Sequence, residues 1–453
     1  MQFRKNYINK NLIIFLFTHL IVWTLVPTLS NNNLPLDTIE ALAWGSNLEW
    51  GFDKHPPLSA FFLEFFYQIF GSNDWAYYFL SQIFVVSTFF IIFKFSKYFF
   101  QDASYGLISV LLLESIYFYN FTTPEFNVNV CQLPFWALSV LYCWKALEEN
   151  KIVDWLLFGL FAALGVLSKY LFIYLLVAID IFFLYLIVNK KIKVNRNFIY
   201  KCSAVLLIFL IILSPHLFWL VNNDYVTITY GLHRTGSGDQ NFLDHFIHPI
   251  IFLSKQIGIL IPFFIICLFL FSKFKIKFNL KSKKLVFLLF VSIVPIFLIF
   301  LTSMIMGVKI RTMWMTPFYL FFGVLFVYIF KKHINLKKTQ NFISVFLVLF
   351  ILSPLSYLFV SLSQKDKRTD YPGKEIAIKV QESWDNNFND KISYVSGDEW
   401  VAGNLSYHLK SRPKWIGLNE VVESKNKLSI VNVYENNISK AISEIGYFKV
   451  YGE

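Results

Sequence analysis

The stretch from Leu12 to Leu29 reads L-I-I-F-L-F-T-H-L-I-V-W-T-L-V-P-T-L and contains no Asp, Glu, Lys or Arg. A helix needs about 20 mostly apolar residues to cross a bilayer, and its backbone polar groups must be satisfied internally in hydrocarbon. Ten further segments of this character follow, at 75–98, 104–121, 128–145, 153–168, 170–189, 201–221, 249–272, 285–303, 312–330 and 341–363. We therefore expect an α-helical polytopic membrane protein with about 11 transmembrane helices.

The composition agrees with a lipid-facing chain. Of 453 residues, 56% are hydrophobic and only 15% are charged, whereas a soluble globular protein carries about a quarter charged residues. This balance excludes a cytosolic enzyme, a disordered protein and a nucleic-acid-binding module. The four cysteines all lie in apolar runs, so we expect neither a disulfide framework nor a CxxC metal site.

The positions of Lys and Arg predict the orientation of the chain. One alternate set of loops holds 22 of these residues and the other set holds five. Because short cytoplasmic loops are enriched in Lys and Arg, the split predicts a cytoplasmic N-terminus, and an odd number of helices then places the C-terminal segment outside. The first segment is interpreted as a retained anchor, because no small-x-small cleavage site precedes Asn31.

The chain becomes polar after the last apolar segment. We expect a transmembrane domain over 1–363 and a small extracytoplasmic α/β domain over 364–453. Within the second, the pattern predicts a helix at 373–384, a strand at 391–396, a helix at 399–409 and a strand near 428–434.

The first outer loop, 30–74, carries the most informative polar residues. Asp37 and Glu40 are three residues apart, so a helix that starts at Asp37 would place both carboxylates on one face of its first turn. Such a helix would be amphipathic and lie at the membrane surface. The alternative is that Asp37 only caps the helix. Further along the loop, Lys54 and His55 precede two prolines that stiffen the chain, and the pair suits phosphate binding.

Other outer-side residues fit the same kind of site. Glu125 must face water or a cavity, since a carboxylate is costly in the bilayer. Lys169 lies in a tight turn and either snorkels or contacts a phosphate. Arg311, with the nearby Lys309, forms a basic pair suited to an anionic ligand. The loop 222–248, with His233 and Arg234, is interpreted as a lid or an acceptor-binding loop.

Several of these strings resemble a known enzyme class. L-D-T-I-E-A-L-A-W-G at 36–45 and G-F-D-K-H-P-P-L-S-A at 51–60 resemble the first outer loop of GT-C membrane glycosyltransferases. The resemblance is to the bacterial group related to protein O-mannosyltransferases and lipid A aminoarabinose transferases (glycosyltransferase family 39-like). It extends through T-P-E-F-N-V-N (123–129), L-S-K-Y (167–170), S-P-H-L-F-W-L (214–220) and K-I-R-T-M-W-M-T-P (309–317).

The resemblance implies a GT-C architecture and a polyprenyl-phosphate sugar donor used on the outer side of the bacterial inner membrane. It implies that Asp37 is the catalytic general base, and we also expect catalytic roles for Glu40 and Glu125. Two departures stand out: relatives have an adjacent Asp-Glu pair, and aminoarabinose transferases read F-E-K-P-P-L where this chain has F-D-K-H-P-P-L. The second departure leaves open which of Lys54 and His55 takes the role of the lysine.

The chemistry that follows is sugar transfer to an envelope acceptor such as lipid A, a lipid-linked glycan or a secreted protein. Lys54, His55, Lys169 and Arg311 would stabilise the departing phosphate, with His233 and Arg234 as further substrate contacts. We assign no metal ligand and no certain cofactor, with a divalent metal ion left open. The competing hypotheses are a transporter or flippase of a lipid-linked sugar, which would use intramembrane charges such as Glu114 and Asp180, and a nonenzymatic scaffold.

Overall fold

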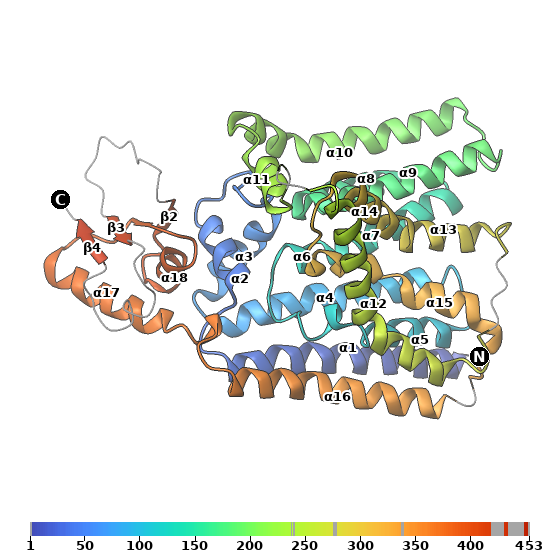
Figure 1. Ribbon diagram of the computed structural model, residues 1–453, viewed down its shortest axis with the longest axis horizontal. Coiled ribbons are helices and arrows are strands. Elements are labelled where there is room, and N and C mark those ends of the chain that lie inside the picture. Colours follow the sequence, from blue (N-terminus) through green and yellow to red (C-terminus); the bar gives the residue numbers. More distant parts are fainter. Residues whose placement is uncertain are drawn as a thin grey trace.

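The computed structural model describes residues 2–236, 238, 241–274, 279–336, 339–417, 430–433 and 448–451. The longer helices, which follow one another in the bundle of Figure 1, are α1 (Gln2–Ser30), α4 (Asp74–Ser96), α7 (Leu133–Glu148), α8 (Ile152–Ser168), α9 (Ile173–Val188), α10 (Arg196–Asn222), α12 (Asp244–Leu270), α14 (Val294–Met306) and α16 (Gln340–Ser363). The shorter ones are α2 (Leu36–Gly45), α3 (Leu58–Phe70), α5 (Ala103–Leu113), α6 (Val128–Cys131), α11 (Val226–Arg234), α13 (Lys283–Ser292) and α15 (Phe322–Phe330). Single-turn 3₁₀ segments and η3 (Thr312–Tyr319) connect them, among them η1 (Tyr117–Tyr119) and η2 (Tyr170–Phe172).

The multi-span membrane fold is confirmed. Among the described residues, eight helical spans are long and apolar enough to cross a membrane, and there are nine if Thr312–Tyr319 and Phe322–His333, which meet at a bend of 50°, are counted as one further span. The predicted segments 104–121 and 153–168 correspond to the shorter apolar helices α5 and α8. Each of the eleven predicted segments thus coincides with helical structure.

One segment is shorter than the sequence indicated. The segment 104–121 is not one helix, because α5 ends at Leu113 and a 3₁₀ turn follows at Tyr117–Tyr119. The Asn120 side chain donates a hydrogen bond of 2.5 Å to the Glu114 carbonyl oxygen. This bond satisfies a carbonyl at the helix end, where no intrahelical donor is present.

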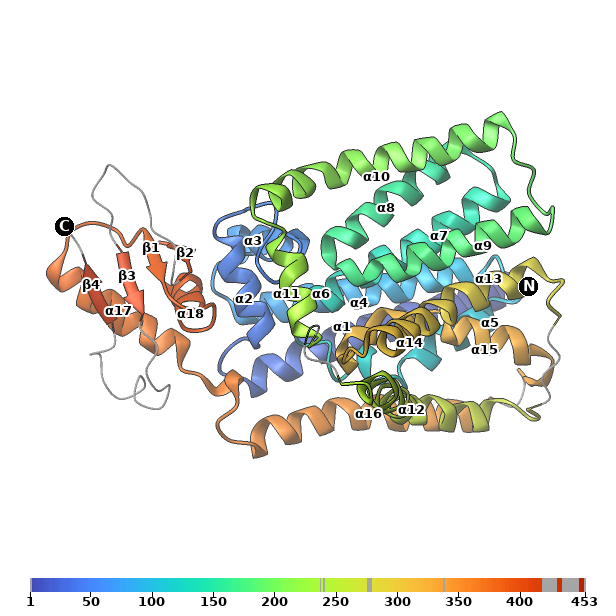
Figure 2. The ribbon, with the colours of Figure 1, turned by 45° about the horizontal axis from the view of Figure 1, so that its top comes forward.

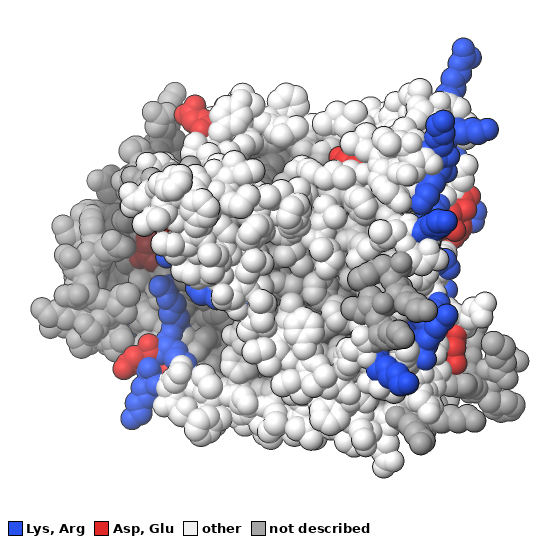
Figure 3. Space-filling model, turned by 45° about the vertical axis from the view of Figure 1, so that its right-hand side comes forward, with Lys and Arg blue, Asp and Glu red and all other residues white. Residues whose placement is uncertain are grey.

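The charged side chains gather at the ends of the bundle. Figure 3 shows a broad band of uncharged side chains, with Lys and Arg concentrated along the edge opposite the C-terminal segment. Ion pairs between helix ends tie that end together: Lys145 of α7 lies 2.6 Å from Asp154 of α8, and Lys283 of α13 lies 2.8 Å from Glu148 of α7. The cation-rich loops therefore meet at one end of the molecule, as the alternation predicted.

The C-terminal segment is an α/β unit at the other end of the bundle (Figure 2). It contains α17 (Gly373–Asn387), α18 (Val401–His408) and a four-stranded sheet in the order β2-β1-β3-β4. The strands are β1 (Tyr394–Ser396), β2 (Lys414–Ile416), β3 (Ile430–Val433) and β4 (Phe448–Tyr451). β1 is parallel to β2 and β3, and β4 is antiparallel to β3. Both predicted helices and both predicted strands are present, with β2 and β4 in addition.

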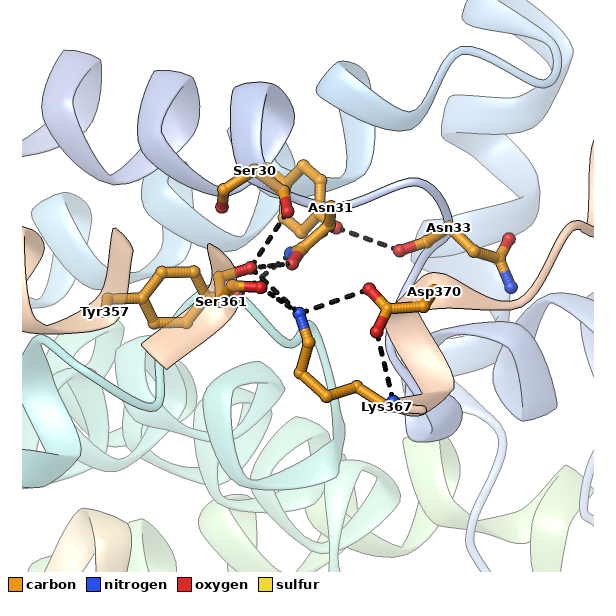
Figure 4. A network of polar contacts seen from close by, with 8 residues as sticks. Ser30, Asn31, Asn33, Tyr357, Ser361, Lys367 and Asp370 are labelled. Atoms are coloured by element: carbon orange, nitrogen blue, oxygen red, sulfur yellow. Dashed lines mark hydrogen bonds and ion pairs between the residues drawn. The ribbon is translucent and has the colours of Figure 1, made fainter. Parts of the chain in front are cut away.

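A polar network joins the end of α1 to the end of α16 and to the linker that follows it (Figure 4). Asn31 Nδ2 donates to the Tyr357 hydroxyl at 3.0 Å, and Ser361 Oγ donates to the Asn31 side-chain oxygen at 2.7 Å. Lys367 Nζ bonds to the Ser361 carbonyl oxygen and lies 3.2 Å from Asp370. The network holds the first outer loop and the C-terminal unit at the same end of the bundle.

Candidate active site

The first outer loop places its carboxylates on α2. This helix begins at Leu36, one residue before the predicted start, and Pro35 occupies the N-cap position without a side-chain cap. Pro35 has no N–H to satisfy and its fixed φ suits a helix entry. The side chain of Asp37 is therefore free for other contacts, and the interpretation of Asp37 as only a helix cap is wrong.

Asp37 lies against the loop that precedes α6. Its backbone N–H donates to Glu125 Oε1 at 3.0 Å, and Asn127 Nδ2 lies 3.4 Å from both the Asp37 and the Glu125 carboxylates. Asn127 Oδ1 in turn accepts from two backbone N–H groups at the start of α6. The asparagine is fixed by this cap, so two carboxylates from distant parts of the sequence are held on one side-chain amide.

A buried lysine completes this cluster. Lys169, 4% exposed, donates a hydrogen bond of 2.5 Å to Asn129 Oδ1. Its Nζ also lies 5.3 Å from the centre of the Trp314 ring, a cation–π contact with η3. The tight turn between α8 and η2 thus directs Lys169 inward rather than to the bilayer surface, so it does not snorkel.

The second half of the loop contributes Lys54 in a different setting. Lys54 Nζ lies 3.0 Å from Glu40 on α2 and 3.0 Å from Glu399, which precedes α18 in the C-terminal unit. One lysine is therefore shared by two carboxylates. The side chains of Glu40 and Asp37 both project from α2, but Glu40 contacts Lys54 whereas Asp37 contacts Asn127.

Burial and charge set the protonation of the two carboxylates. Burial raises the pKa of Asp37, while the charges of Lys169, Lys54 and Arg234 and the Asn127 bond act to lower it. The pKa of Glu125 is raised by burial and by the negative charge of Asp37. Because the neighbouring cations act on Asp37, Glu125 takes up a proton first. Asp37 is therefore the member of the pair that is better suited to accept a proton.

The basic residues are also shifted by burial. Burial lowers the pKa of Lys169 to about 7, against the opposing effect of Asp37. Burial, with the charges of Lys169, Lys54 and Arg234, lowers the pKa of His55 to about 3. His55 is therefore neutral at pH 7 and could contact a phosphate only through a ring N–H, whereas Lys54 keeps its charge.

The remaining predicted residues lie around this cluster at greater distance. Arg234 is exposed at the end of α11 and stacks over Tyr230, yet its charge acts on Asp37 and His55. His233 is exposed beside it and makes no side-chain contact with the cluster among the described residues. Arg311 lines a separate cavity of about 560 Å³ beside η3, together with Lys309.

Sequence reasoning missed several residues that complete the site. Asn127 and Asn129 were quoted within the T-P-E-F-N-V-N string without a role, and Glu399 lies 345 positions after its partner Lys54. The position of Asn127 and Asn129 beside an apolar run could have indicated a role in the site, because buried side-chain amides need hydrogen-bond partners. No pattern links Glu399 to Lys54, since the contact depends on how the C-terminal unit docks.

The structure places the two intramembrane acids proposed for a transport pathway at the end of α5 and on α9. Glu114 lies 3.0 Å from His19 Nδ1, and both side chains are fully buried between α5 and α1. Asp180 is exposed on α9. Within the part of the chain that the structure describes, no three His, Cys, Asp or Glu side chains are placed to hold a metal ion.

Comparisons with known proteins place this geometry in context. Residues 54–219 match the family model described as dolichyl-phosphate-mannose-protein mannosyltransferase. No curated protein matches the chain by sequence.

Solved structures give a match over nearly the whole chain. The structure is similar to ArnT from Cupriavidus metallidurans bound to undecaprenyl phosphate, with TM-score 0.63, 10% identity and coverage of 93% of this chain and 92% of that chain. The apo state of ArnT gives TM-score 0.65 and 10% identity over 94% and 93%. AglB from Archaeoglobus fulgidus matches at TM-score 0.45 and 10% identity, over 89% of this chain and 64% of that one.

Proposed function

We propose that this chain is a GT-C membrane glycosyltransferase that transfers one sugar from a polyprenyl-phosphate donor to an envelope acceptor, a proposal supported by the family model over 54–219 and by the fold that the chain shares with ArnT. The acceptor would be lipid A, a lipid-linked glycan or a protein, on the outer side of the bacterial inner membrane. The observation that carries the proposal is the Asp37 cluster: the Asp37 and Glu125 carboxylates share the Asn127 side-chain amide, and the buried Lys169 lies nearby on Asn129. ArnT, one of the solved structures with this fold, was crystallised with undecaprenyl phosphate.

The proposed step is a direct displacement with inversion. The acceptor oxygen forms a bond to the anomeric carbon from the face opposite the phosphate, and the bond between that carbon and the phosphate oxygen breaks. Its electron pair leaves with the polyprenyl phosphate. Asp37 accepts the proton of the acceptor hydroxyl as general base, a role worth roughly 10²- to 10⁴-fold in rate. Glu125 and Glu40 are proposed to hold Asp37 and Lys54 in position.

The basic groups are proposed to bind the anionic parts of the substrates. Lys169, Lys54 and Arg234 would stabilise the charge that develops on the departing phosphate. His55 would contribute an N–H, and His233 would contribute a contact from the C-terminal end of α11. Arg311 is proposed as a substrate contact in the neighbouring cavity. An acceptor that is already ionised would need no base, and Asp37 would then only position it.

The proposal is tested with purified protein, labelled polyprenyl-phosphate sugar and a panel of acceptors. We expect the wild-type protein to transfer the label and Asp37→Asn to lose roughly 10²- to 10⁴-fold in kcat. The matched control is Asp385→Asn on the exposed face of α17, which should keep full activity. Equal transfer by Asp37→Asn would refute the base assignment, and absence of transfer by the wild-type protein with every acceptor would refute the enzyme class.

The location is tested separately by labelling. A cysteine introduced at Ser46, which is partly exposed just after α2, should react with a membrane-impermeant maleimide added to intact spheroplasts. Reaction only after the cells are opened would place α2 on the cytoplasmic side. The proposed donor presents its sugar on the outer side, so this result would contradict the proposal.

A further inference from the structure

A cavity of about 560 Å³ lies beside the Asp37 cluster but does not include it. Its walls come from η1, from α12 and from the segment 309–313 that leads into η3. In Figure 1, α12 runs through the bundle from α11 toward the end where the N-terminus lies. The cavity is therefore bounded by membrane helices on one side and by outer-loop segments on the other.

Three cations line this cavity without a counter-ion. The side chains of Lys255, Lys309 and Arg311 form no hydrogen bond or ion pair within the described ranges, and the lining there includes no Asp or Glu. His248, also in the lining, differs from them, because its ring bonds to the Gly307 carbonyl oxygen at 2.8 Å and lies 3.5 Å from Asp244. The excess positive charge of the cavity is thus carried by the two lysines and the arginine.

Lys255 is the most informative of the three, since it lies within a membrane-spanning helix. It is eleven residues after the first residue of α12, which corresponds to about 16 Å along the helix axis. An ionisable side chain at such a position is costly and marks a functional site when it faces a cavity. Lys255 is exposed to this cavity, and no anionic side chain among the described residues pairs with it, so it is available to bind an anion.

The charge of the cavity indicates which anion fits. A sugar joined to a polyprenyl phosphate is a phosphodiester with a single negative charge, whereas a phosphomonoester carries close to two at pH 7 and a diphosphate more. Three uncompensated cations match the more highly charged groups. The lining also contains the apolar side chains Phe118, Ile251 and Met313, which suit the hydrocarbon part of a lipid.

The position of the cavity indicates which substrate would use it. The Trp314 ring contacts Lys169 of the Asp37 cluster, and the Trp314 backbone N–H donates to the Arg311 carbonyl oxygen at 3.1 Å. A single turn of chain therefore separates the cavity from the proposed reaction centre. Two substrates whose reacting ends must meet would be bound on either side of such a turn.

We propose that the cavity binds the phosphomonoester or diphosphate group of the acceptor lipid, through Lys255, Lys309 and Arg311. The assignment of this ligand as the acceptor rests on the proposed function. Under this proposal Arg311 binds the acceptor and not the donor phosphate. The donor phosphate is bound by Lys169, Lys54 and Arg234. The proposal also selects a phosphorylated lipid over a protein as acceptor.

A binding experiment tests the site without any sugar transfer. Purified protein is titrated with phosphatidic acid, a phosphomonoester lipid, with phosphatidylglycerol, a phosphodiester lipid, and with inorganic phosphate. We expect phosphatidic acid to bind about tenfold or more tightly than phosphatidylglycerol, and Lys255→Met to remove about tenfold of that affinity, as expected for one charge-assisted contact. Equal binding of the two lipids, or no effect of Lys255→Met, would overturn the site. Inorganic phosphate that binds as tightly as phosphatidic acid would overturn its assignment to a lipid.

Two further variants keep the test interpretable. Lys94→Met on α4 removes a lysine of another membrane helix, where it lies over Phe90, and should leave phosphatidic acid binding unchanged. Lys255→Arg preserves the charge and should bind phosphatidic acid as the wild type does. Such binding would show that the loss in Lys255→Met comes from the missing charge. A loss with Lys94→Met equal to that with Lys255→Met would show a nonspecific charge effect and reject the site.

Kinetics then test the acceptor assignment in a preparation that transfers sugar. Lys255→Met is expected to raise KM for the acceptor about tenfold, with KM for the donor within about twofold of the wild type. A rise in the donor KM instead would overturn the acceptor assignment while leaving the anion site intact. Because the lipid-binding experiment needs no turnover, an inactive wild-type protein would count against the proposed function and not against the site.

Discussion

At the scale of single residues, the protonation of the candidate site depends on a competition between burial and neighbouring charge. Burial alone would neutralise Asp37, Glu125 and Lys169. The charges of Lys169, Lys54 and Arg234 oppose the effect of burial on the pKa of Asp37, whereas the charge of Asp37 adds to the effect of burial on the pKa of Glu125, so Glu125 holds its proton more tightly. Lys169 is the residue whose charge is most sensitive near neutral pH, with its pKa lowered to about 7.

A pH profile should report Lys169 directly. Since its amine is cationic only below its pKa, the attraction for the donor phosphate is present at low pH and is lost as pH rises through about 7. We expect kcat/KM for the donor, which reflects the free enzyme, to fall above pH 7. Lys169→Arg, whose guanidinium stays charged, should extend activity to higher pH.

The control for this profile is Lys379→Arg on the exposed face of α17, which should keep the wild-type alkaline limb. A wild-type profile that stays flat through pH 7 to 9, or a Lys169→Arg profile with the same limb as wild type, would contradict the role of Lys169.

The acidic side of the same profile tests the order in which the two carboxylates take up protons. Glu125 Oε1 accepts the backbone N–H of Asp37, and the side-chain oxygen of Glu125→Gln can keep that bond. Because Glu125 takes up its proton before Asp37 does, it is already neutral when Asp37 titrates, so the acidic limb of kcat/KM should stay at the wild-type pH in Glu125→Gln. An acidic limb that moves to lower pH, measured in the same buffers, would show that Glu125 is still ionised when Asp37 titrates and would contradict this order.

At the scale of elements, α2 carries the candidate base and is held from two sides. The loop before α6 bonds its first turn, with Thr38 Oγ1 donating to the Phe126 carbonyl oxygen at 3.1 Å. The C-terminal unit packs on its other side. At Gly403 of α18, an added Cβ would lie 3.2 Å from Ala43 Cβ and 3.2 Å from Ile39 Cγ2, so the two helices approach too closely for a larger side chain.

The pairing of Lys54 across this interface predicts a change in donor affinity. Glu399 competes with any incoming phosphate for the Lys54 ammonium group. Glu399→Gln removes one of the two carboxylates, so KM for the donor should fall by about two- to fivefold, the range of a partly exposed ion pair, with kcat little changed. Steady-state kinetics with Glu382→Gln, an exposed glutamate of α17, as control will check this. An unchanged or higher donor KM in Glu399→Gln would contradict the competition.

At the scale of the whole molecule, the C-terminal unit is bound to the membrane part through buried polar contacts. Arg412 lies 2.6 Å from Glu64 on α3 and donates at 2.6 Å to the Leu42 carbonyl oxygen at α2. Its guanidinium also lies 4.2 Å from the centre of the Tyr67 ring. Asn33 Nδ2 donates to Asn404 at 2.9 Å, and the Tyr407 hydroxyl donates to Asp74 at 2.7 Å.

Removal of the arginine should release this unit. In Arg412→Met the Glu64 carboxylate is left buried without its partner, a loss of about 3–5 kcal/mol. We expect faster limited proteolysis within the linker 364–372 and a lower thermal midpoint of tryptophan fluorescence. The double variant Arg412→Met/Glu64→Gln should recover most of the loss, because no unpaired carboxylate remains. Unchanged proteolysis in Arg412→Met would show that these contacts do not hold the unit.

The architecture could be predicted from local patterns. Runs of apolar residues such as 12–29 must become helices, because the bilayer leaves no other way to satisfy the backbone. The charges of the loops were sufficient to predict which loops lie at the same end of the bundle. The pattern of the polar segment after 363 was sufficient to predict α17, α18 and two strands. The helix break after Leu113 was missed, because it depends on a side-chain bond from Asn120 and not on hydropathy.

The candidate site was predicted in its residue types but not in its grouping. Asp37 and Glu125 could be selected as costly outer-side acids, yet their contact spans 88 positions. Glu399 beside Lys54 and Lys255 beside Arg311 were not foreseen. Hydropathy and charge act over a few residues and were readable in the sequence alone, whereas distances between charges, and the pKa values that burial and those distances produce, exist only once the helices have packed.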